Sequence, residues 1–359
     1  MEAVLLVGGQ GTRLRPLTIA TPKPMLPVAG VPCTTHQIAR AREAGVTRVV
    51  LGTSYRAEVF SDHYGDGEAL GVELVYVTED EPLGTGGAIR NVADRLSSGP
   101  DDPVLVFNGD ILSGLDIAGL VRHHVEHDAD VTLYLTRVDD PRAYGLVPTD
   151  ADGAVTSFLE KPTRDEDIVT DQINAGCYVF RRSVIDEIPA GRVVSVERET
   201  FPGLLAAGRR VLGVVDDGYW LDLGTPLAFV QGSADLVRGI APSPALPGQP
   251  GEALLLPGSV VSASAEVTGG TVVGAGAVVQ DGAAVDASVI LDGAVIGPRA
   301  RVRRSVVGAD ASIGADTVLD GVVVGDRASI GAGNELREGA RVWPDAELAD
   351  GALRFSSDR

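Results

Sequence analysis

Glycine and basic residues gather at the end of the first predicted strand, where they could bind phosphate groups. The strand Ala3–Val7 runs directly into GGQGTRLRPLT at residues 8–18, and Lys23 follows in TPKPMLP. Glycines after a strand let backbone N–H groups approach a phosphate, because no Cβ atom obstructs them. The spacing matches neither the P-loop pattern nor the dinucleotide-binding pattern. With Arg13, Arg15 and Lys23 beside it, the loop indicates a polyphosphate site, although a tight strand-to-helix turn alone would also explain its glycines.

The two lysines, Lys23 in PKP and Lys161 in EKP, are a second sign of phosphate chemistry. All the other residues among the 30 Lys and Arg are arginine. Arginine presents a planar fork of donors, whereas lysine presents a compact point charge. Two lysines kept in an arginine-rich chain therefore indicate positions that require a point charge. The alternative is that both are chance survivors of a composition bias.

Two aspartates follow predicted strands and could take part in the same chemistry. Asp110 stands in VFNGD, and Asp222 stands in YWLDLGTP. Aspartate is also a common helix N-cap and turn former, so position alone leaves both roles open.

These residues belong to a predicted α/β domain that extends to residue 239. Short β-branched runs alternate with amphipathic segments, which is typical of a largely parallel sheet with helices on both faces. Ligands of such sheets bind at the carboxyl ends of the strands. The predicted strands are Ala3–Val7, Arg48–Leu51, Glu73–Val77, Val104–Asn108, Val131–Thr136, Gly176–Phe180 and Val211–Val215. The predicted helices include Thr34–Ala44, Thr85–Leu96 and Asp116–His127.

A proline-rich segment and a repeat make up the rest of the chain. Residues 240–258 contain five prolines and no periodic apolar pattern, so we expect a semi-rigid connector there. In residues 259–359 apolar residues recur with gaps of 6, 6 and 5, which gives coils of 17 residues with three short strands each. This pattern resembles the hexapeptide repeat of left-handed β-helices. The inward positions are Val273, Val279, Val285, Ile290, Ile296, Val302, Val307, Ile313, Leu319, Val324, Ile330 and Leu336.

The coil register also predicts a ladder of charges on one face of the solenoid. Asp286, Arg303, Asp320 and Arg337 are spaced 17 residues apart, each directly after an inward position. Cross-strand opposite charges contribute about 0.2–1 kcal/mol each. We therefore interpret the cluster of Arg299, Arg301, Arg303 and Arg304 as a solvated ladder and not as an anion site.

Composition excludes several classes of protein. The 359 residues carry a net charge of −20, which disfavours binding to a nucleic-acid polymer. Two cysteines are too few for a disulfide framework and favour a reducing compartment. No apolar run reaches the ~18–20 residues of a membrane helix, and the N-terminus resembles a first strand more than a signal peptide. We expect a cytoplasmic protein that acts without a membrane.

Taken together, the motifs of the first domain resemble those of the sugar-nucleotide pyrophosphorylases. The pattern G-x-G-T-R-x-R-P-L-T followed by K-P is that family's signature. The resemblance continues through EPLGTGGA (residues 81–88), VFNGD (106–110), AYGLV (143–147), FLEKP (158–162), NAGCYVF (174–180) and YWLDLGTP (219–226). Within the family, the length and domain plan are most similar to those of the actinobacterial mannose-1-phosphate guanylyltransferases. The resemblance implies a Rossmann-like nucleotidyltransferase domain followed by the β-helix.

The resemblance also implies the reaction and its participants. A sugar 1-phosphate oxygen attacks the α-phosphorus of a nucleoside triphosphate, and pyrophosphate leaves. The sugar phosphate is mostly ionised at neutral pH, so no general base is required. The implied substrates are GTP and mannose 1-phosphate, and the implied cofactor is Mg²⁺, held by Asp110 and Asp222. The β-helix implies a homo-oligomer.

Roles of single residues carry over from the matching motifs. The resemblance implies that Arg13 and Lys23 hold the triphosphate, that Lys161 holds the sugar phosphate, and that these three act in catalysis together with Asp110. The nucleotide-binding positions are Leu6, Gly8, Gly9, Gly11, Thr12, Arg13, Lys23, Glu79, Gly84 and Asp110. The sugar-phosphate-binding positions are Gly145, Glu160, Lys161 and Asn174. A carboxylate at Glu79 suits guanine, which presents two donors, although Glu79 could equally be a solvated loop residue.

Three alternatives remain open at the level of the sequence. The enzyme could use another sugar phosphate, such as glucose 1-phosphate, with UTP, dTTP or ATP, because nothing in these residues reads the axial 2-hydroxyl of mannose. A non-catalytic regulatory homologue is a second alternative, although the chain retains the basic loop and both aspartates. An acyltransferase function for the β-helix is disfavoured, since all five histidines precede the solenoid and that chemistry normally employs a histidine base.

Overall fold

The computed structural model describes residues 1–54, 56–246 and 248–354. It divides into two compact units. The first unit comprises Met1–Gly9 and Gln37–Trp220, and the second comprises Gln10–His36 and Leu221–Arg359. No helix in the described residues is both long and apolar enough to cross a lipid bilayer.

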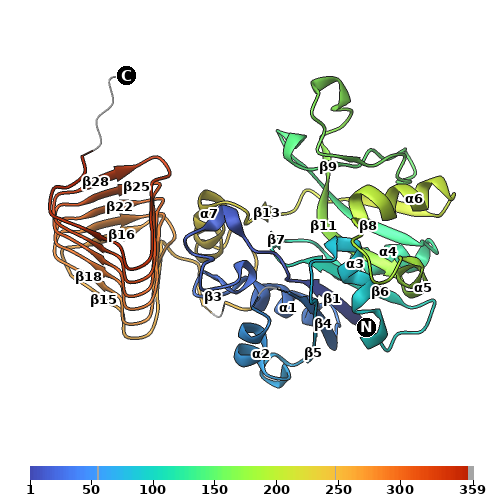
Figure 1. Cartoon of the computed structure of the whole chain (residues 1–359), viewed down its shortest axis with the longest axis horizontal. Helices are drawn as coiled ribbons and strands as arrows, with labels where there is room; N and C mark the ends of the chain where they lie inside the picture. The colour runs from blue at the N-terminus through green and yellow to red at the C-terminus, as the bar shows by residue number, and fades with distance from the viewer. Residues whose placement is uncertain (55, 247, 355–359) are drawn as a thin grey trace. The chain divides into compact units, whose positions relative to one another are not determined.

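The first unit is built on one mixed sheet, drawn from blue to yellow-green in Figure 1. Its main path runs β10-β9-β11-β6-β1-β4-β5, and β8 pairs with β11 and with β12. The strands β6, β1, β4 and β5 are parallel to one another, whereas β11 runs antiparallel to both β6 and β8. The strands of this sheet are β1 Glu2–Leu6, β4 Arg48–Thr53, β5 Glu73–Thr78, β6 Pro103–Asn108, β8 Val131–Arg137, β9 Gly145–Leu146, β10 Leu159–Glu160, β11 Gln172–Arg181 and β12 Val211–Val215. The short strand β7 Ile111–Ser113 lies outside this sheet.

Helices connect these strands and complete the predicted α/β pattern. They are α1 Cys33–Glu43, which begins in the second unit, then α2 Glu58–Tyr64, α3 Gly84–Asn91, α4 Ile117–Glu126, α5 Arg182–Glu187 and α6 Phe201–Ala206. All seven predicted strands and the predicted helices near residues 34–44 and 116–127 are confirmed within a few residues. The helix predicted at 85–96 is shorter, because α3 ends at Asn91 and a 3₁₀ turn, Ala93–Arg95, follows.

The core of the first unit explains why the strands read as apolar runs. Val4 and Val106 on one face of the sheet and Leu5 and Leu105 on the other are at most 1% exposed, so both faces of the central strands are covered. Aromatic rings of β11 and α6 fill the next layer, with the Tyr178 and Phe201 ring centroids 5.3 Å apart.

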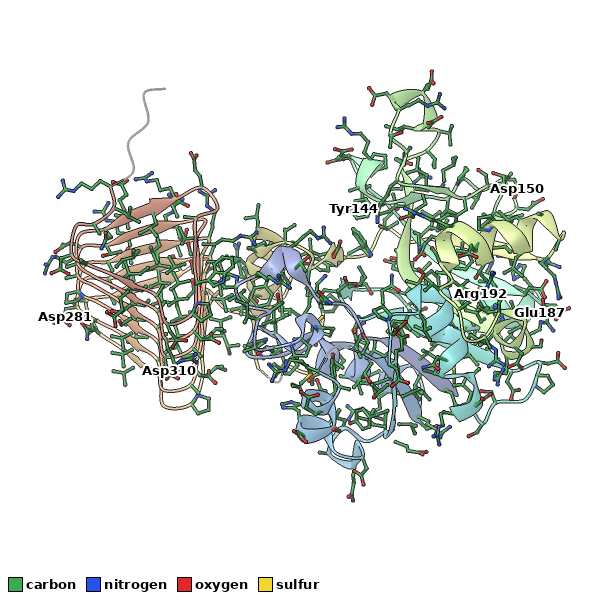
Figure 2. All side chains as sticks on the ribbon, viewed as in Figure 1. Tyr144, Asp150, Glu187, Arg192, Asp281 and Asp310 are labelled. Atoms are coloured by element: carbon green, nitrogen blue, oxygen red, sulfur yellow. The ribbon has the colours of Figure 1, made fainter. Side chains whose placement is uncertain are left out.

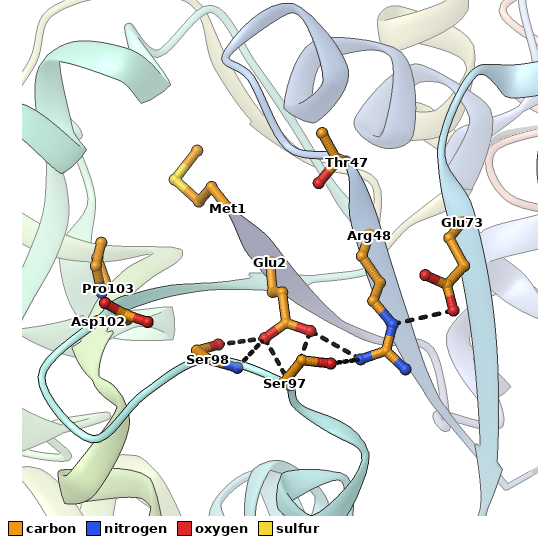
Figure 3. A pocket seen from close by; sticks show the side chains of 9 residues that line it. All are labelled: Met1, Glu2, Thr47, Arg48, Glu73, Ser97, Ser98, Asp102 and Pro103. Carbon is orange, nitrogen blue, oxygen red and sulfur yellow. Dashed lines mark hydrogen bonds and ion pairs between the residues drawn. The ribbon is translucent and has the colours of Figure 1, made fainter.

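The amino-terminal edge of the sheet holds a buried carboxylate. Glu2 accepts hydrogen bonds from the backbone of Ser97 and Ser98 and from Arg48, beside an open cavity of about 610 Å³ (Figure 3). Burial alone would raise the pKa of Glu2, but the bonds from Ser98, Ser97 and Arg48 lower it to about 2. The residues that line this cavity thus already form a satisfied ion-pair network. The cavity lies at the amino-terminal ends of the strands, opposite to the loops that carry the predicted site.

The second unit contains the signature loop, a small hairpin, one long helix and the solenoid. The hairpin strands are β2 Pro27–Val28 and β3 Val31–Pro32, the short strand β13 spans Trp220–Asp222, and the helix α7 spans Pro226–Val237. Thr225 caps α7, because its hydroxyl accepts from the Ala228 N–H at 3.2 Å. The helix packs against β17 of the solenoid, where Gly270 leaves no room for a side chain, since a Cβ atom there would lie 2.7 Å from the Ala234 backbone.

The solenoid consists of three sheets, each made of parallel strands, which is consistent with the predicted left-handed β-helix (Figure 1). All twelve predicted inward residues are buried, none more than 5% exposed. The first sheet contains β14 Ala253–Leu255, β17 Thr271–Val273, β20 Val289–Ile290, β23 Val306–Val307, β26 Val323–Val324 and β29 Arg341–Val342. The second contains β15 Val260–Val261, β18 Val278–Val279, β21 Val295–Ile296, β24 Ser312–Ile313, β27 Ser329–Ile330 and β30 Glu347–Leu348. The third contains β16 Glu266–Thr268, β19 Ala284–Asp286, β22 Arg301–Arg303, β25 Val318–Asp320 and β28 Glu335–Arg337.

The solenoid extends beyond the repeat that the sequence pattern identified. Leu255 pairs with Val273 and Val324 pairs with Val342, so these end coils have one residue more than the 17 of the middle coils. The strand β14 also lies inside residues 240–258, which we expected to form only a connector. The division into domains 1–239, 240–258 and 259–359 itself stays a prediction.

The charge ladder has the predicted register, but its ion pairs differ in part. Asp286 faces Arg303, and their side chains lie 3.8 Å apart. Asp320 instead accepts from Arg304 at 2.6 Å, since the left-handed backbone of Arg304 (φ +45°) turns that side chain at the corner. Arg337 contacts Glu335 of its own strand at 2.6 Å. Arg299 pairs with Asp316 through two hydrogen bonds, as expected for a solvated face and not for an anion site.

Candidate active site

The predicted site residues are distributed over both units, and each group is described within its own unit. The first unit holds Leu6, Gly8, Gly9, Glu79, Gly84, Asp110, Gly145, Glu160, Lys161 and Asn174. The second holds Gly11, Thr12, Arg13, Lys23 and Asp222.

The first glycines of the signature loop follow β1 directly. Leu6 is the last residue of β1 and pairs with Gly52 and Asn108 on the neighbouring strands. A Cβ atom at Gly8 would lie 2.7 Å from the Ser54 hydroxyl, so this position is closed to larger residues. Gly9 is exposed, and no heavy atom lies within 4 Å of the place where its Cβ would be. The open side of this loop is therefore available to a ligand of the kind that glycine loops bind.

The second part of the loop wraps tightly around Lys23. Gly11 has a φ of +59° and begins the 3₁₀ turn Thr12–Leu14. A Cβ atom at Gly11 would lie 2.8 Å from the Lys23 Cβ and 3.0 Å from the Thr18 methyl group. The Thr18 hydroxyl donates to the Gly11 carbonyl at 2.9 Å. Glycine is needed here both for its backbone conformation and for the close approach of Lys23.

Asp222 lies between the two predicted phosphate-binding cations of the second unit. The Lys23 Nζ atom is 3.6 Å from one Asp222 oxygen, and an Arg13 Nη atom is 3.9 Å from the other. The Arg13 side chain is 66% exposed, whereas that of Lys23 is 10% exposed. The structure thus brings three of the predicted residues together and leaves the guanidinium of Arg13 accessible to an anion.

Asp110 follows β6 in a turn that is anchored to β1. The Gly109 N–H donates to the Leu6 carbonyl at 2.9 Å, and a Cβ atom at Gly109 would lie 2.5 Å from that oxygen. Asp110 itself is half-buried. Residues 1–54, 56–246 and 248–354 contain no group of three or more His, Cys, Asp or Glu side chains that could hold a metal ion.

The donor set suits a divalent metal that shares its ligands with phosphates. Asp110 and Asp222 each offer a half-buried carboxylate and no soft ligand. Mg²⁺ typically binds through one or two carboxylates, keeps several waters and takes the rest of its ligands from substrate phosphates. Each aspartate, within its own unit, is therefore a ligand of the type that such an ion takes, and neither supplies the thiolate or imidazole typical of zinc sites.

Glu79 directly follows β5, and one of its carboxylate oxygens is buried without a hydrogen-bond partner among the described residues. Its other oxygen accepts from the Leu83 N–H at 3.4 Å. Burial raises the pKa of Glu79, which the bond from Leu83 only partly opposes. A buried acceptor without a donor is costly unless a ligand supplies one, so Glu79 is suited to a base edge that presents N–H groups.

Gly84 has a packing role that the sequence did not indicate. Its φ is +71°, and a Cβ atom would lie 2.7 Å from the Val194 carbonyl. The same carbonyl accepts from the N–H groups of Gly86 and Gly87 at 2.8 and 3.2 Å. The glycines of EPLGTGGA are therefore required by the close approach of residues 192–194 to the start of α3.

A short antiparallel pair, β9 and β10, brings the predicted sugar-phosphate residues together. Gly145 faces Glu160, and a Cβ atom at Gly145 would lie 2.8 Å from a Glu160 carboxylate oxygen. The Lys161 Nζ atom lies 3.1 Å from the other Glu160 oxygen. Lys161 is exposed and has a φ of +48°, a conformation that non-glycine residues adopt mainly at turns and functional sites.

Asn174 is displayed by a bulge in β11. The pairing of β11 with β8 shifts between Asn174 and Tyr178, and Gly176 inside the bulge has a φ of +76°. The Asn174 amide donates to the Tyr178 hydroxyl at 2.8 Å, and its oxygen accepts from the Gly176 N–H at 3.1 Å. Bulges commonly re-aim a side chain beside an active site, and the motif NAGCYVF encodes this one.

Two aromatic residues tie these motifs together and were not predicted as functional. The Trp220 indole donates to the Ala175 carbonyl in the bulge at 3.0 Å. Tyr144, labelled in Figure 2, packs edge-on against Trp220 with ring centroids 5.4 Å apart. The Tyr144 carbonyl accepts from the Lys161 N–H at 3.1 Å. Their positions inside the motifs AYGLV and YWLDLGTP could have indicated that they lie at the site.

A second group missed by the sequence analysis surrounds Glu197. The Thr85 and Ser195 hydroxyls donate to one of its oxygens at 2.8 and 2.6 Å. Residues Val196–Thr200 form a turn of π-helix, a feature that often marks functional sites. Strand β10, which carries Glu160, contacts this turn.

Comparison with known proteins matches both halves of the chain to family models. Residues 2–239 match the nucleotidyl transferase family, and residues 250–352 match the GMPPB C-terminal domain. The chain is 56% identical to a mannose-1-phosphate guanylyltransferase of Mycobacterium tuberculosis, over 100% of this chain and 98% of the relative. It is 38% identical to a mannose-1-phosphate guanylyltransferase catalytic subunit beta of Drosophila pseudoobscura pseudoobscura, over 86% of this chain and 83% of the relative.

A solved structure resembles the nucleotidyl transferase part. HddC from Yersinia pseudotuberculosis, crystallised in complex with GMP-PN, has a TM-score of 0.56 and 28% identity. The match covers 66% of this chain and 99% of HddC.

Proposed function

Because the chain belongs to the nucleotidyl transferase family, we propose that it transfers GMP from GTP to mannose 1-phosphate and releases GDP-mannose and pyrophosphate. The observation that carries this proposal is the 56% identity to a mannose-1-phosphate guanylyltransferase across the entire chain, solenoid included. The complex of HddC with GMP-PN supports a guanine nucleotide.

The proposed reaction is an in-line displacement at the α-phosphorus. A bond forms between that phosphorus and an oxygen of the sugar phosphate, while the bond to the bridging oxygen of the β-phosphate breaks. The attacking phosphate is already largely ionised at neutral pH, so the protein need only align two polyanions and neutralise the developing charge. A bound divalent cation, which we propose to be Mg²⁺ held by Asp110 and Asp222, supplies Lewis acidity to phosphate oxygens.

Both units contribute binding residues in this proposal. In the second unit, Arg13 and Lys23 hold the triphosphate and stabilise the leaving pyrophosphate. They are now paired with Asp222, and phosphate oxygens would replace that carboxylate as their partner. The backbone of Gly11 and Thr12 adds phosphate contacts in this unit, and in the first unit Leu6 and the backbone of Gly8 and Gly9 contact the nucleotide.

In the first unit, Glu79 and Gly84 contact the guanine base, and Glu160, Asn174 and the Gly145 backbone bind sugar hydroxyls. Lys161 holds the sugar phosphate. Its ammonium group is exposed and already lies near Glu160, so a phosphate can approach it without rearranging the core.

The assembly and the location of the protein are further parts of the proposal. We propose a homo-oligomer that forms through the solenoid, which size-exclusion chromatography with light scattering would test. Cys33 and Cys177 are both buried and are not joined in a disulfide, which supports a reducing, cytoplasmic setting.

The test is a matrix of four nucleotides against several sugar 1-phosphates, with pyrophosphate release as the readout. We expect GTP with mannose 1-phosphate to give the highest kcat/KM. A different pair, such as UTP, dTTP or ATP with glucose 1-phosphate, that wins by more than about tenfold would overturn the assignment. Absence of pyrophosphate release with every pair would favour a regulatory homologue.

A further inference from the structure

Gln37 joins helix α1 to the turn that carries Asp110. Its side-chain Nε2 donates to the Asn108 carbonyl at 2.7 Å and to the Ile111 carbonyl at 3.0 Å. These two carbonyls flank Gly109 and Asp110 in the chain. One amide group therefore holds the backbone on both sides of the aspartate.

The burial of Gln37 indicates that its main role is to donate these two hydrogen bonds. The residue is 8% exposed, so water cannot readily replace the amide as a donor. Its Oε1 atom is buried and has no hydrogen-bond partner among the described residues. An unsatisfied buried oxygen is unfavourable, which indicates that the two N–H bonds to the turn are the reason for an amide at this position.

The turn is fixed from the β1 side as well. The Gly109 N–H donates to the Leu6 carbonyl at 2.9 Å. Gln37 of α1 and Leu6 of β1 thus hold the backbone around Asp110 at three points, namely the carbonyls of Asn108 and Ile111 and the N–H of Gly109. Groups that orient a metal ligand typically contribute 10–100-fold to metal affinity or activity.

We propose that Gln37 is a positioning residue for the divalent cation that Asp110 holds, an inference that rests on the proposed function. Gln37 touches neither the metal nor the substrates in this proposal. It acts through the turn 108–111, by fixing where the Asp110 carboxylate is presented.

The experiment compares full-length wild type with Gln37→Met, which keeps the length of the side chain and removes both donors. Mn²⁺ binding is measured by electron paramagnetic resonance in the presence of GTP, and kcat and KM are measured separately. We expect the Mn²⁺ Kd to rise and kcat to fall by about tenfold each, with the KM of mannose 1-phosphate changed by less than about twofold. A lower Tm with unchanged Mn²⁺ affinity and kcat would show a merely structural role and overturn the proposal.

Three further variants separate the possible outcomes. Gln231→Met removes another glutamine amide, one that bonds Asp235 at 2.7 Å within α7, and should leave Mn²⁺ affinity unchanged. Gln37→Leu also removes both donors and is of similar volume, so it should repeat the Gln37→Met result if the methionine variant does not fold. Asp110→Asn tests the underlying assignment: if it binds Mn²⁺ as well as wild type, the proposed metal site is wrong and this inference falls with it. If Asp110→Asn loses Mn²⁺ while both Gln37 variants keep it, only the inference about Gln37 is wrong.

Discussion

The Lys23 ammonium lies 3.6 Å from the Asp222 carboxylate, inside a loop whose backbone leaves it little freedom. Only 10% of the Lys23 side chain is exposed, and the Gly11 backbone closes over its Cβ atom. The ammonium group is therefore held in place by the loop and is already paired with a carboxylate. The same pair connects the PKP and YWLDLGTP motifs, which lie nearly 200 residues apart in the chain.

We expect Lys23→Arg to reduce kcat by about 10²-fold or more, since a planar guanidinium cannot occupy the space and role of an ammonium at a phosphate. The fold should be retained, as judged by circular dichroism and Tm. Arg209→Lys, at an exposed pair with Glu187, is the matched control and should behave as wild type. A Lys23→Arg enzyme with near-normal turnover would refute the requirement for a point charge.

Gly11→Ala tests the loop that surrounds Lys23. An added Cβ would meet Lys23 and Thr18 at 2.8 and 3.0 Å, and alanine must adopt a φ of +59°. We expect a loss of roughly 1–3 kcal/mol in the free energy of unfolding and a higher KM for GTP. The control is Gly203→Ala in α6, where no atom lies within 4 Å of the new Cβ and the helix should be unchanged or more stable. Equal stability of the two variants in denaturant titrations would contradict this account.

Glu79→Gln tests the selection of the nucleobase. Replacing the buried acceptor by an amide should reduce kcat/KM for GTP by about 10–100-fold and affect UTP much less, because guanine offers two donors. The neighbouring Glu81 is exposed, so Glu81→Gln is the control. Parallel losses with both nucleotides would assign Glu79 to the structure of the loop and not to the base.

The pH dependence of selectivity gives the same hypothesis a second readout. Burial raises the pKa of Glu79, so its ionised form is lost at a higher pH than that of an ordinary glutamate. The preference for GTP over UTP should therefore decline on acidification before exposed carboxylates protonate.

The sequence predicted those features that depend on a regular pattern along the chain. The solenoid is linear, so a spacing of 17 residues predicts the register of Asp286 with Arg303 directly. The strands of the first unit were also recognisable, because buried parallel strands are continuous β-branched runs. For the site, the motifs indicated Lys23, Asp222, Glu160 and Lys161. The structure pairs Lys23 with Asp222 and Lys161 with Glu160, and their roles stay predictions.

Features that arise from contacts between distant segments could not be predicted in this way. The hydrogen bonds of Gln37 to the Asp110 turn join residues more than 70 positions apart in the chain. A glutamine on a predicted helix is usually an ordinary surface residue, so its position alone indicated no role. The pairing of Arg304 with Asp320 depends on a corner conformation that the repeat does not specify. Glu197 could not be predicted because it is defined by the two hydroxyls that donate to it, one of which, that of Thr85, comes from α3.

His124 should make the stability of the first unit sensitive to pH. The residue is 4% exposed and contacts the Thr132 hydroxyl at 3.0 Å. Burial, together with the charge of Arg181, lowers the pKa of His124 from 6.5 to about 4, against the opposing effect of Asp130 and Asp128. Between these values the unfolded chain binds the proton more strongly, so stability is complete above about pH 6.5 and declines as the pH falls toward 4, by about 3 kcal/mol. Urea titrations across this range should show the decline in wild type and a smaller one in His124→Gln; an identical decline in both would exclude His124 as its source.

Ser305 and Arg299 should differ in their contributions to the solenoid, although both make good hydrogen bonds. Ser305 is fully buried; its hydroxyl accepts from the Val322 N–H at 3.0 Å and donates to the Arg303 carbonyl at 2.6 Å, as part of a ladder with Ser288 and Thr271. Ser305→Ala leaves the buried Val322 N–H without its acceptor, whereas the Arg303 carbonyl keeps its bond from the Gly321 N–H at 3.0 Å. We therefore expect a loss of about 1–3 kcal/mol in the free energy of unfolding, from the unpaired N–H. Arg299→Ala removes an exposed, solvent-screened ion pair with Asp316 and should lower the free energy of unfolding much less than Ser305→Ala does. Denaturant unfolding of the two variants decides the matter: a larger loss for Arg299→Ala would mean that the charged corners, and not the buried hydroxyl ladder, stabilise the coils.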